Sequence, residues 1–573
     1  MSLQKMLCTL GKFDIPIIQL QPPFVVDLLD SNIALFGTAM SGKTTFIKTL
    51  VNILHKQYNE NQEQVFILDF GGALAEYKEM PLVSAYFDNS NEEYVKRVFK
   101  ILDSILKDNI KELDGKNFRD SDVPLKHTTF VIDNINAFID EPRYMAYQEK
   151  LAKLCRDGLS KGITIVITAV DTKGVASYLG SFKQKIAFEM PHDKYAEIFT
   201  DKVGMIGNNP GHGFANVTVK PEGVTGTFRM NLPYELQATL PYATDDSGDT
   251  QEVFIRKLRE KFAYSGEQYA KCVKKYQTFP KELTRNEYEK LRQQIGQEEL
   301  VREDAISVGL DYVDFNPVNI NLEKSHVVAI YGKKEFGKTN LLRLLIQGFM
   351  KQKKDARFVF FDDGRNQLES IYNDVKGTVD SVLISKYEEV ELCLKDETTK
   401  VKKLSPLQQF YVYLNNNYIT LDKRFMAGIY GVSKEMSKEF MKIPDCESNC
   451  PPFTVFVIQS KLVYLNTTEN KFFMNVILPQ LAAVAEEQGF CFIFTDVQKI
   501  SDGEQNMFFN NVISTAFLLD NIAEFAGERG QKTIFGNMDV KTLKEDYARC
   551  EIGDGYYYDV EADNLLKLKF IKS

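Results

Sequence analysis

A glycine-rich loop with the pattern G-x-x-x-x-G-K-T occurs twice in this chain, once in each half. The first copy is "GTAMSGKT" at residues 37–44, and the second is "GKKEFGKT" at residues 332–339. Each copy follows an apolar run, "NIALF" or "HVVAIY", and precedes a stretch with helical spacing. A loop of this kind requires a strand before it and a helix after it, because backbone N–H groups and the helix N-terminus then converge on one anion. The duplication therefore predicts two strand–loop–helix units, each able to hold phosphate.

The remainder of each half repeats the same order of features. A second strand ends in an acidic turn ("VFILDFGG", "FVFFDDGR"), and a third and a fourth apolar strand follow ("TTFVIDN" and "ITIVITAVD"; "FTVFVIQS" and "CFIFTDVQ"). Each half then has an Ala-Phe strand and a Gly-x-Gly segment. Strands that alternate with helical stretches indicate an α/β fold, here twice, with mostly parallel sheets and helices on both faces. We expect a first module at residues 1–240, a helical linker at 241–300 and a second, degenerate module at 301–573.

The composition limits the location and the partners of the chain. The net charge of −9 and the pI of about 5.5 give no general attraction to nucleic acid, so no nucleic-acid partner is expected. No run approaches the roughly 20 apolar residues that cross a bilayer, and the start lacks the pattern of a signal peptide. The eight cysteines are scattered and form no zinc-ligand pattern. These observations predict a cytoplasmic chain with reduced thiols.

The two loops predict bound ATP with Mg²⁺. Lys43 and Lys338 would reach the β- and γ-phosphates, while the hydroxyl groups of Thr44 and Thr339 would ligate the metal. An alternative for the second loop is a retained turn whose site has lost its nucleotide. The predicted nucleotide-binding residues are Gly37, Thr38, Ala39, Met40, Ser41, Gly42, Lys43, Thr44 and Thr45 in the first half, and Gly332, Lys333, Lys334, Glu335, Phe336, Gly337, Lys338, Thr339 and Asn340 in the second.

The acidic partners of the two loops differ. In the first half "FVIDN" supplies Asp133 as a metal ligand, but Asn134 follows where many motors of this class carry a glutamate base. Asparagine can orient a water molecule but cannot take its proton, so we expect slow turnover. In the second half Gln459 and Ser460 occupy these two positions. We expect no hydrolysis there and assign no catalytic residue in either half.

A second interpretation of this region remains open. Three other carboxylates, Asp362, Asp363 and Asp496, end neighbouring strands, and one of them could restore the missing metal ligand.

The ordered features resemble the FtsK/SpoIIIE-type ATPases of type VII secretion, the EssC/EccC family. The resemblance rests on "LGKFDIPIIQLQPP", "SNIALFGTAMSGKTTFIKTL" and "IGDGYYYDVEADNLLKLKFIKS", among others, and covers nearly the whole chain. It implies two tandem RecA-like P-loop domains from the C-terminal end of a longer, membrane-anchored motor. It also implies nucleotide binding with little turnover, and recognition of a C-terminal signal on small helical-hairpin substrates of the WXG type. The other implied partners are an upstream ATPase module, the membrane part of the full-length protein, and a hexamer as the candidate assembly.

Two other functions compete with this interpretation. A DNA translocase shares the module, but such motors usually need one fully competent ATPase module and often a winged-helix DNA reader, which the sequence does not show. The other alternative is a non-catalytic receptor in which ATP is a structural ligand that stabilises the folded state by mass action. An ABC-type transporter is disfavoured, since no "LSGGQ"-like signature follows either loop.

Overall fold

The chain folds as two compact units, Met1–Thr278 and Phe279–Ser573, which we call the first and the second unit. Each unit is described by itself below. In this computed structural model the described residues are 5–16, 19–89, 92–207, 209–221, 229–242, 253–257, 260, 274–295, 304–332, 334–362, 367–393, 399–421, 441–442, 452–459, 473–497, 512–520 and 550–573.

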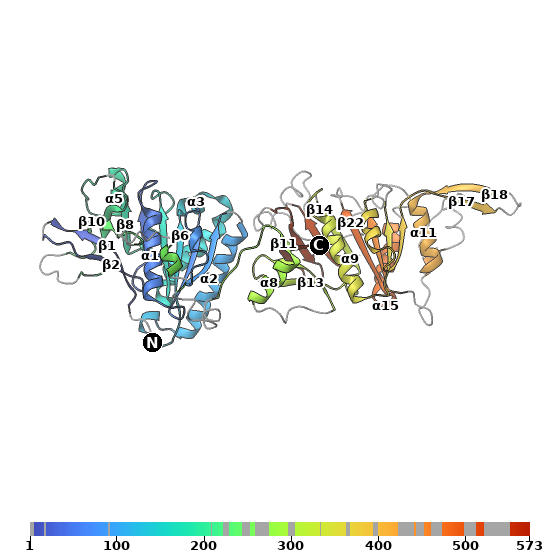
Figure 1. Cartoon of the computed structure of the whole chain (residues 1–573), viewed down its shortest axis with the longest axis horizontal. Helices are drawn as coiled ribbons and strands as arrows, with labels where there is room; N and C mark the ends of the chain where they lie inside the picture. Colours follow the sequence, from blue (N-terminus) through green and yellow to red (C-terminus); the bar gives the residue numbers. More distant parts are fainter. Residues whose placement is uncertain are drawn as a thin grey trace. The chain divides into compact units, whose positions relative to one another are not determined.

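The first unit is built on one ten-stranded sheet (Figure 1). In the spatial order given next, the strands from β8 (Gln184–Phe188) to β5 (Val83–Asp88) run parallel. The strands from β2 (Pro23–Asp27) to β9 (His212–Asn216) pair antiparallel. In spatial order the strands are β2 (Pro23–Asp27), β1 (Leu7–Asp14), β10 (Pro233–Ala238), β9 (His212–Asn216), β8 (Gln184–Phe188), β3 (Ile33–Phe36), β7 (Ile163–Ala169), β6 (His127–Asp133), β4 (Glu63–Asp69) and β5 (Val83–Asp88).

Helices cover both faces of this sheet, as alternating side chains of one strand show. Val131 of β6 belongs to the core that contains Phe46 of α1 (Lys43–Gln57), whereas its neighbour Phe130 packs edge-on against Phe99 of α2 (Glu92–Leu113). Strands covered on both faces are buried along their whole length, and "HTTFVID" of β6 is buried at every position. The helices are α1 (Lys43–Gln57), α2 (Glu92–Leu113), α3 (Ile135–Asp140), α4 (Met145–Asp157) and α5 (Tyr195–Ile198), with short 3₁₀ turns at Ala75–Tyr77, Phe118–Asp120, Pro142–Tyr144, Leu159–Lys161, Leu179–Ser181 and His192–Lys194.

The second unit repeats this sheet strand by strand. Its spatial order is β13 (Pro317–Ile320), β12 (Ile306–Asp311), β25 (Asn564–Lys572), β24 (Asp554–Asp559), β23 (Thr515–Leu519), β14 (Val327–Gly332), β22 (Phe490–Val497), β21 (Thr454–Gln459), β15 (Arg357–Phe361) and β16 (Asp380–Ile384). Again the strands from β23 onward are parallel, and the first strands pair antiparallel. The two sheets confirm the predicted α/β fold with tandem modules.

The second unit adds elements that the repeated pattern did not predict. Strand β17 (Glu388–Cys393) pairs antiparallel with β18 (Thr399–Leu404), and β19 (Thr420–Leu421) pairs antiparallel with β20 (Met441–Lys442). Between these pairs lies α11 (Pro406–Asn417), which begins with a capping box formed by Ser405 and Gln408. The other helices are α9 (Lys338–Gln352), α10 (Glu369–Val375), a π-helical turn (Phe473–Ile477), α14 (Leu478–Ala483) and α15 (Ala485–Gln488).

The boundary between the units falls inside the range expected to be a helical linker. Within the described part of that range, residues 253–257 and Arg285–Ile295 (α8) are helical. Tyr276 belongs to the first unit, where its N–H donates to the Ser84 carbonyl (2.7 Å). Phe279 belongs to the second and stacks on Phe315. The chain therefore passes from one unit to the next between Thr278 and Phe279.

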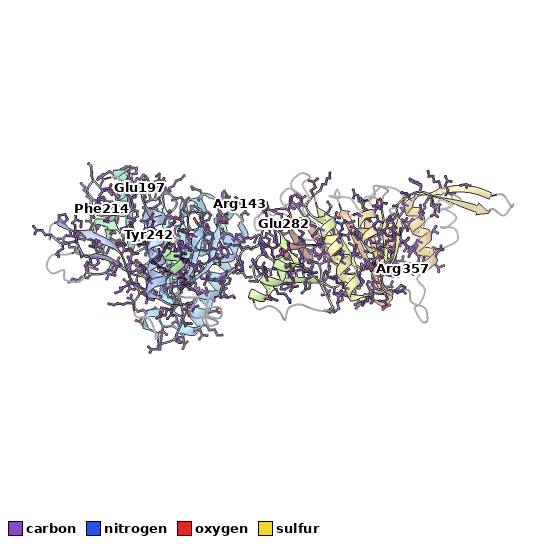
Figure 2. The ribbon with its side chains drawn as sticks, in the orientation of Figure 1. Arg143, Glu197, Phe214, Tyr242, Glu282 and Arg357 are labelled. Carbon is purple, nitrogen blue, oxygen red and sulfur yellow. The ribbon has the colours of Figure 1, made fainter. Side chains whose placement is uncertain are left out.

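The second unit also contains a short strand, β11 (Leu283–Thr284), that pairs in parallel with the end of β25. Glu282, labelled in Figure 2, precedes β11 and forms an ion pair with Lys572 (2.7 Å). Helix α8 follows β11 at once, with Tyr288 buried in the core of the unit.

Among the described residues, none of the helices combines the length and the apolar content that a bilayer crossing would need.

Candidate functional site

The two glycine-rich loops have the same backbone shape. Gly42 and Gly337, which precede α1 and α9, have φ angles of 102° and 103°, a conformation that favours glycine. Met40 and Glu335, two residues earlier, also have positive φ angles, 65° and 71°. A non-glycine residue with positive φ is uncommon, so its recurrence at the same position indicates that both loops are wound in one way. The described residues of the second loop have therefore kept the conformation of the first as well as the motif.

The first loop is held on its neighbours by backbone contacts. Thr38 donates to the Glu189 carbonyl from its N–H (2.8 Å) and from its hydroxyl group (3.0 Å). The Gly211 N–H donates to the Ser41 carbonyl (2.8 Å), and a Cβ added to Gly42 would lie only 2.7 Å from the nitrogen of Gly211. The Gly-x-Gly segment thus packs directly against the loop.

Lys43 lies over the first loop. Its ammonium group donates to the carbonyls of Gly37 (2.6 Å) and Thr38 (2.7 Å). Burial lowers the pKa of Lys43, and the negative charge of Asp133 opposes that shift. Both groups therefore belong to one electrostatic site at the carboxyl ends of β3 and β6, which is where open α/β sheets bind their ligands.

Asp133 ends β6 and is oriented by two hydroxyl groups. Thr168 of β7 donates to one carboxylate oxygen (2.6 Å), and Thr44 donates to the other (3.4 Å). Burial raises the pKa of Asp133, the bond from Thr168 lowers it, and the charge of Asp69 raises it further. Burial and Asp69 thus disfavour the ionised form of Asp133, and a cation held by Thr44 and Asp133 would stabilise that form.

The donor set of the first unit fits Mg²⁺. This ion prefers hard oxygen ligands and is commonly held by one or two carboxylates together with phosphate oxygens and water. The Thr44 hydroxyl group and the Asp133 carboxylate lie within hydrogen-bond distance of each other and would supply the protein ligands of such a site. Over the residues that the structure describes, no group of three or more His, Cys, Asp and Glu side chains forms a self-contained metal cage.

Asn134 follows Asp133 in a left-handed conformation, with φ at 62°. Its N–H donates to the Thr168 hydroxyl (2.8 Å), so Thr168 fixes both residues. Asparagine is one of the few residues that adopt this conformation readily.

Asp69, at the end of β4, is close to this site but has a structural role. Its carboxylate accepts from the N–H groups of Gly71 (2.9 Å), Gly72 (2.7 Å) and Leu74 (2.8 Å), and from the hydroxyl group of Tyr86 (3.0 Å). Four donors occupy the lone pairs of a carboxylate. Asp69 therefore fixes the loop after β4, and its oxygens have little capacity left to bind a metal.

In the second unit Lys338 repeats the geometry of Lys43, since its ammonium group donates to the Gly332 carbonyl (2.7 Å). The metal position differs. Gln459 is buried at the end of β21 and donates from its side chain to the Gln367 side chain (2.6 Å). Thr495 lies directly beside Gln459 in the sheet, as Thr168 lies beside Asp133. The orienting threonine has thus been kept while the carboxylate is absent.

One of the three alternative carboxylates can be placed. Asp362 is buried and accepts from the Leu368 N–H (2.7 Å), as Asp69 accepts from Leu74. Asp363, Ser460, Lys333 and the side chain of Asp496 lie outside the described residues.

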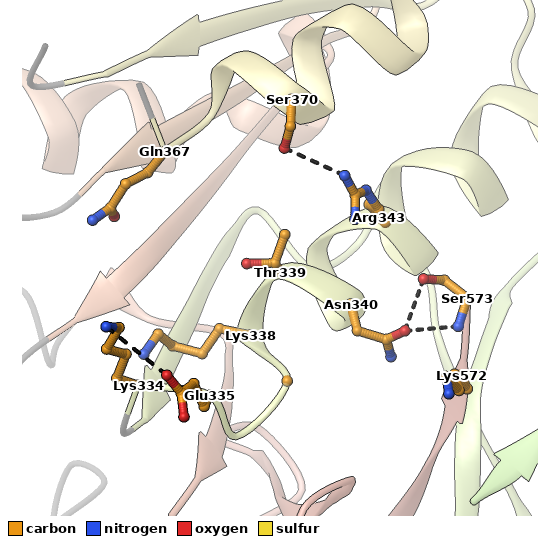
Figure 3. Close-up of a pocket in the computed structure, with 11 residues that line it drawn as sticks. Lys334, Glu335, Lys338, Thr339, Asn340, Arg343, Gln367, Ser370, Lys572 and Ser573 are labelled. Carbon is orange, nitrogen blue, oxygen red and sulfur yellow. Dashed lines mark hydrogen bonds and ion pairs between the residues drawn. The ribbon is translucent and has the colours of Figure 1, made fainter. Parts of the chain in front are cut away.

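A pocket of about 650 Å³ lies at the second loop. Figure 3 shows Lys334, Glu335 and Lys338 on one side of it, and Asn340 with Ser573 on the other. Arg343 donates to the Ser370 hydroxyl group (3.3 Å) and forms an ion pair with Asp374 (2.9 Å). The lining residues are Lys334, Glu335, Gly337, Lys338, Thr339, Asn340, Arg343, Gln367, Ser370, Lys572 and Ser573.

The sequence predictions did not include six residues of the two sites. Thr168 belongs to the first unit, and Arg343, Gln367, Ser370, Lys572 and Ser573 line the pocket of the second. One signal was present for Thr168, because "VITAVD" and "IFTDVQ" place a threonine at the same point of both halves. Arg343 lies one turn after the second loop in α9, whereas Gln367, Ser370, Lys572 and Ser573 are farther along the chain and reach the loop only through the fold.

Residues 10–179, within the first unit, match the sequence model of the FtsK/SpoIIIE family. The chain is 21% identical over 378 residues to the type VII secretion system protein EssC of Staphylococcus aureus strain MRSA252, which covers 64% of this chain and 24% of that protein. It is 25% identical over 358 residues to the ESX secretion system protein EccC of Geobacillus thermodenitrificans strain NG80-2, which covers 61% of this chain and 23% of the relative. The chain thus spans about a quarter of the length of these relatives.

Two solved structures are similar over the whole chain. ATPases 2 and 3 of EssC from Geobacillus thermodenitrificans superpose with a TM-score of 0.60 at 18% identity, over 100% of this chain and 96% of that one. ATPases 2 and 3 of EccC from Thermomonospora curvata, in complex with a signal sequence peptide, give a TM-score of 0.58 at 14% identity, over 100% and 93% of the two chains.

Proposed function

Because this chain belongs to the FtsK/SpoIIIE family through its first unit and has the fold of tandem EssC/EccC ATPases 2 and 3, we propose that it is the ATP-binding part of a type VII secretion motor. In this role it recognises small WXG-type substrates and helps to export them. Hydrolysis is weak in the first unit and absent in the second.

The observation that carries this division is the contrast between the two metal positions. Asp133 has Thr168 and Thr44 as hydrogen-bond donors, whereas Gln459 is buried and bonded to Gln367. A neutral amide gives no charge to hold Mg²⁺, and bound Mg²⁺ would supply charge neutralisation on the transferring phosphate. The first unit therefore has the parts for slow turnover, and the second has the parts for binding alone.

Each residue then has a definite task. The N–H groups of the two loops and the start of α1 or α9 face the phosphates, and Lys43 or Lys338 exchanges its loop carbonyls for phosphate oxygens. In the first unit Thr44 and Asp133 would hold Mg²⁺. Asn134 orients an attacking water molecule without accepting its proton, so hydrolysis is slow.

The substrate and assembly partners come from the same proposal. The Thermomonospora curvata EccC was solved with a signal sequence peptide, which supports recognition of a C-terminal signal by this chain. An upstream ATPase module, a membrane part and a hexameric assembly belong to the proposed full-length motor.

Binding of a substrate peptide tests this function against the DNA translocase. A peptide with the C-terminal signal of a small WXG-type substrate is expected to bind the full chain at physiological salt, while duplex DNA is not. Both affinities can be measured by fluorescence anisotropy at two salt concentrations. Submicromolar DNA binding that weakens steeply with salt, without peptide binding, would favour the translocase instead.

The variant Asn134→Glu is expected to raise ATP turnover of the full chain about tenfold or more, because a positioned general base typically contributes about 10²-fold or more. Phosphate release with excess Mg²⁺-ATP measures this. Asn134→Gln is the matched control, since it carries the same backbone strain at a positive φ but no proton acceptor. Equal rates in the two variants would show that a different group limits the reaction.

A further inference from the structure

The end of β25 lines the same pocket as the second phosphate loop. Lys572 and Ser573 line the same pocket as Lys338 and Thr339. In Figure 3 they lie beside Asn340, on the opposite side of the start of α9 from Lys338. A ligand on the loop that extends along this pocket therefore meets two segments that are far apart in the sequence.

Asn340 holds these two segments together. It directly follows Thr339 in the first turn of α9, and its side-chain amide group donates to the Ile571 carbonyl (2.9 Å). Its side-chain oxygen accepts from the N–H of Ser573 (2.7 Å) and from the Ser573 hydroxyl group (2.7 Å). Both halves of one amide are thus used to fix the end of β25 beside the loop.

The end of β25 in turn holds β11 and the start of α8. Leu283 pairs with Ile571, and Thr284 pairs with Lys572. The Thr284 N–H donates to the Glu287 carboxylate (2.9 Å), and the Glu287 N–H donates to the Thr284 hydroxyl group (3.3 Å). This reciprocal pair is a capping box, which fixes the first turn of α8. The pairing of β11 with β25 and the capping box of α8 therefore link α8 to the strand end that lines the pocket.

The first unit attaches its corresponding strand differently. There Thr49 of α1 donates to the Thr239 carbonyl (2.9 Å), and Asn52 donates to the Pro241 carbonyl (2.9 Å). These side chains come one to two turns after the loop, whereas Asn340 is adjacent to it. The direct connection between loop and strand end is thus a feature of the second unit.

We propose that Asn340 is a positioning residue that couples nucleotide occupancy of the second unit to the order of β11 and α8. This inference rests on the proposed function, since it requires a nucleotide on the second loop. The nucleotide contacts Lys338, Thr339 and the end of β25 together, so it binds the ordered arrangement best and stabilises it. By reciprocity, loosening the end of β25 weakens nucleotide binding. The elements that respond begin just after the boundary between the units.

Hydrogen exchange of the full-length Lys43→Ala chain, in which only the second loop binds, tests the coupling. Adding ATP is expected to slow exchange about tenfold in two segments, Lys338–Leu345 at the loop and Leu283–Ile295 in β11 and α8. In the additional variant Asn340→Ala, saturating ATP is expected to protect the loop but not β11 and α8. Its affinity for ATP should also fall about fivefold or more, the lower end of usual coupling between two sites.

Matched variants separate coupling from general destabilisation. Asn417→Ala makes the same change at an exposed asparagine of α11 and should behave like the parent chain. Lys572→Ala changes an exposed side chain and should reduce protection of β11 and α8, whereas Lys351→Ala, on the far end of α9, should not.

Two results would overturn the inference. ATP protection of the loop with no change in β11 and α8 would refute the coupling and leave the proposed function intact. ATP protection of neither segment would refute nucleotide binding by the second unit, and the coupling with it.

Discussion

Replacing Lys43 by alanine is expected to weaken ATP binding to the first unit at least about a hundredfold. A hydrogen bond between charged groups contributes about 1.5–3 kcal/mol, and the ammonium group of Lys43 would make at least two such bonds to phosphate oxygens. Its present acceptors, the carbonyls of Gly37 and Thr38, show that it already lies over the loop. Loss of about 3 kcal/mol corresponds to roughly a hundredfold change in Kd.

Titration of a fluorescent ATP analogue measures this effect. The experiment uses full-length Lys338→Ala protein, so that only the first loop can bind. Lys56→Ala is the matched control, because it removes the same charge from the exposed last turn of α1. Unchanged affinity in Lys43→Ala would mean that the nucleotide does not bind at this loop.

The second unit is expected to bind ATP almost independently of Mg²⁺ and to leave it intact. Its loop has the shape of the first loop, and Lys338 lies in place, so the phosphate contacts are available. The carboxylate that would bind the metal is replaced by Gln459. Removing Mg²⁺ with a chelator should therefore change the affinity of this unit by less than about threefold, since little metal-dependent binding energy remains.

The variant Gln459→Asp reverses this loss in part. Thr495 lies beside position 459 and can orient a new carboxylate, as Thr168 orients Asp133. We expect Mg²⁺ to strengthen ATP binding to this variant about tenfold, because a carboxylate now contributes to the metal site. Gln459→Asn has the same size as the aspartate variant without its charge, and it should remain insensitive to Mg²⁺.

The features that sequence could predict are those set by local residue patterns. Alternating apolar strands, the two G-x-x-x-x-G-K-T loops and the acidic or neutral residue after each third strand lie within short segments, and the fold places them as expected. The repeat predicted the same sequence of strands and helices in both halves, and the spatial order of the strands came from the structure.

The role of the acidic residues at neighbouring strand ends could not be predicted in this way. Asp69 and Asp362 follow apolar strands just as Asp133 does, and the sequence alone offered Asp362 as a metal ligand. In the structure the N–H groups of Gly71, Gly72 and Leu74 donate to Asp69, and the N–H of Leu368 donates to Asp362. Whether such a carboxylate accepts from the following N–H groups or stays available to a ligand is decided by the backbone conformation after the strand.

The residues of the second pocket show the same limit at longer range. Asn340 was predicted as part of the loop, but its contacts with Ile571 and Ser573 depend on the antiparallel strands that return beside α9. Gln367 was absent from the prediction, although it is the hydrogen-bond partner of Gln459. Such pairs form only when the sheet is assembled.

The identity of the nucleotide bound to the second unit tests the central claim most directly. Full-length Lys43→Ala protein is incubated with Mg²⁺ and ATP, separated from free nucleotide and denatured, and the released nucleotide is identified by ion-exchange chromatography. We predict close to one ATP per chain, little ADP and no steady release of phosphate. Recovery of ADP with continued phosphate release, abolished by a further Lys338→Ala change, would contradict the account and show that the second unit hydrolyses ATP.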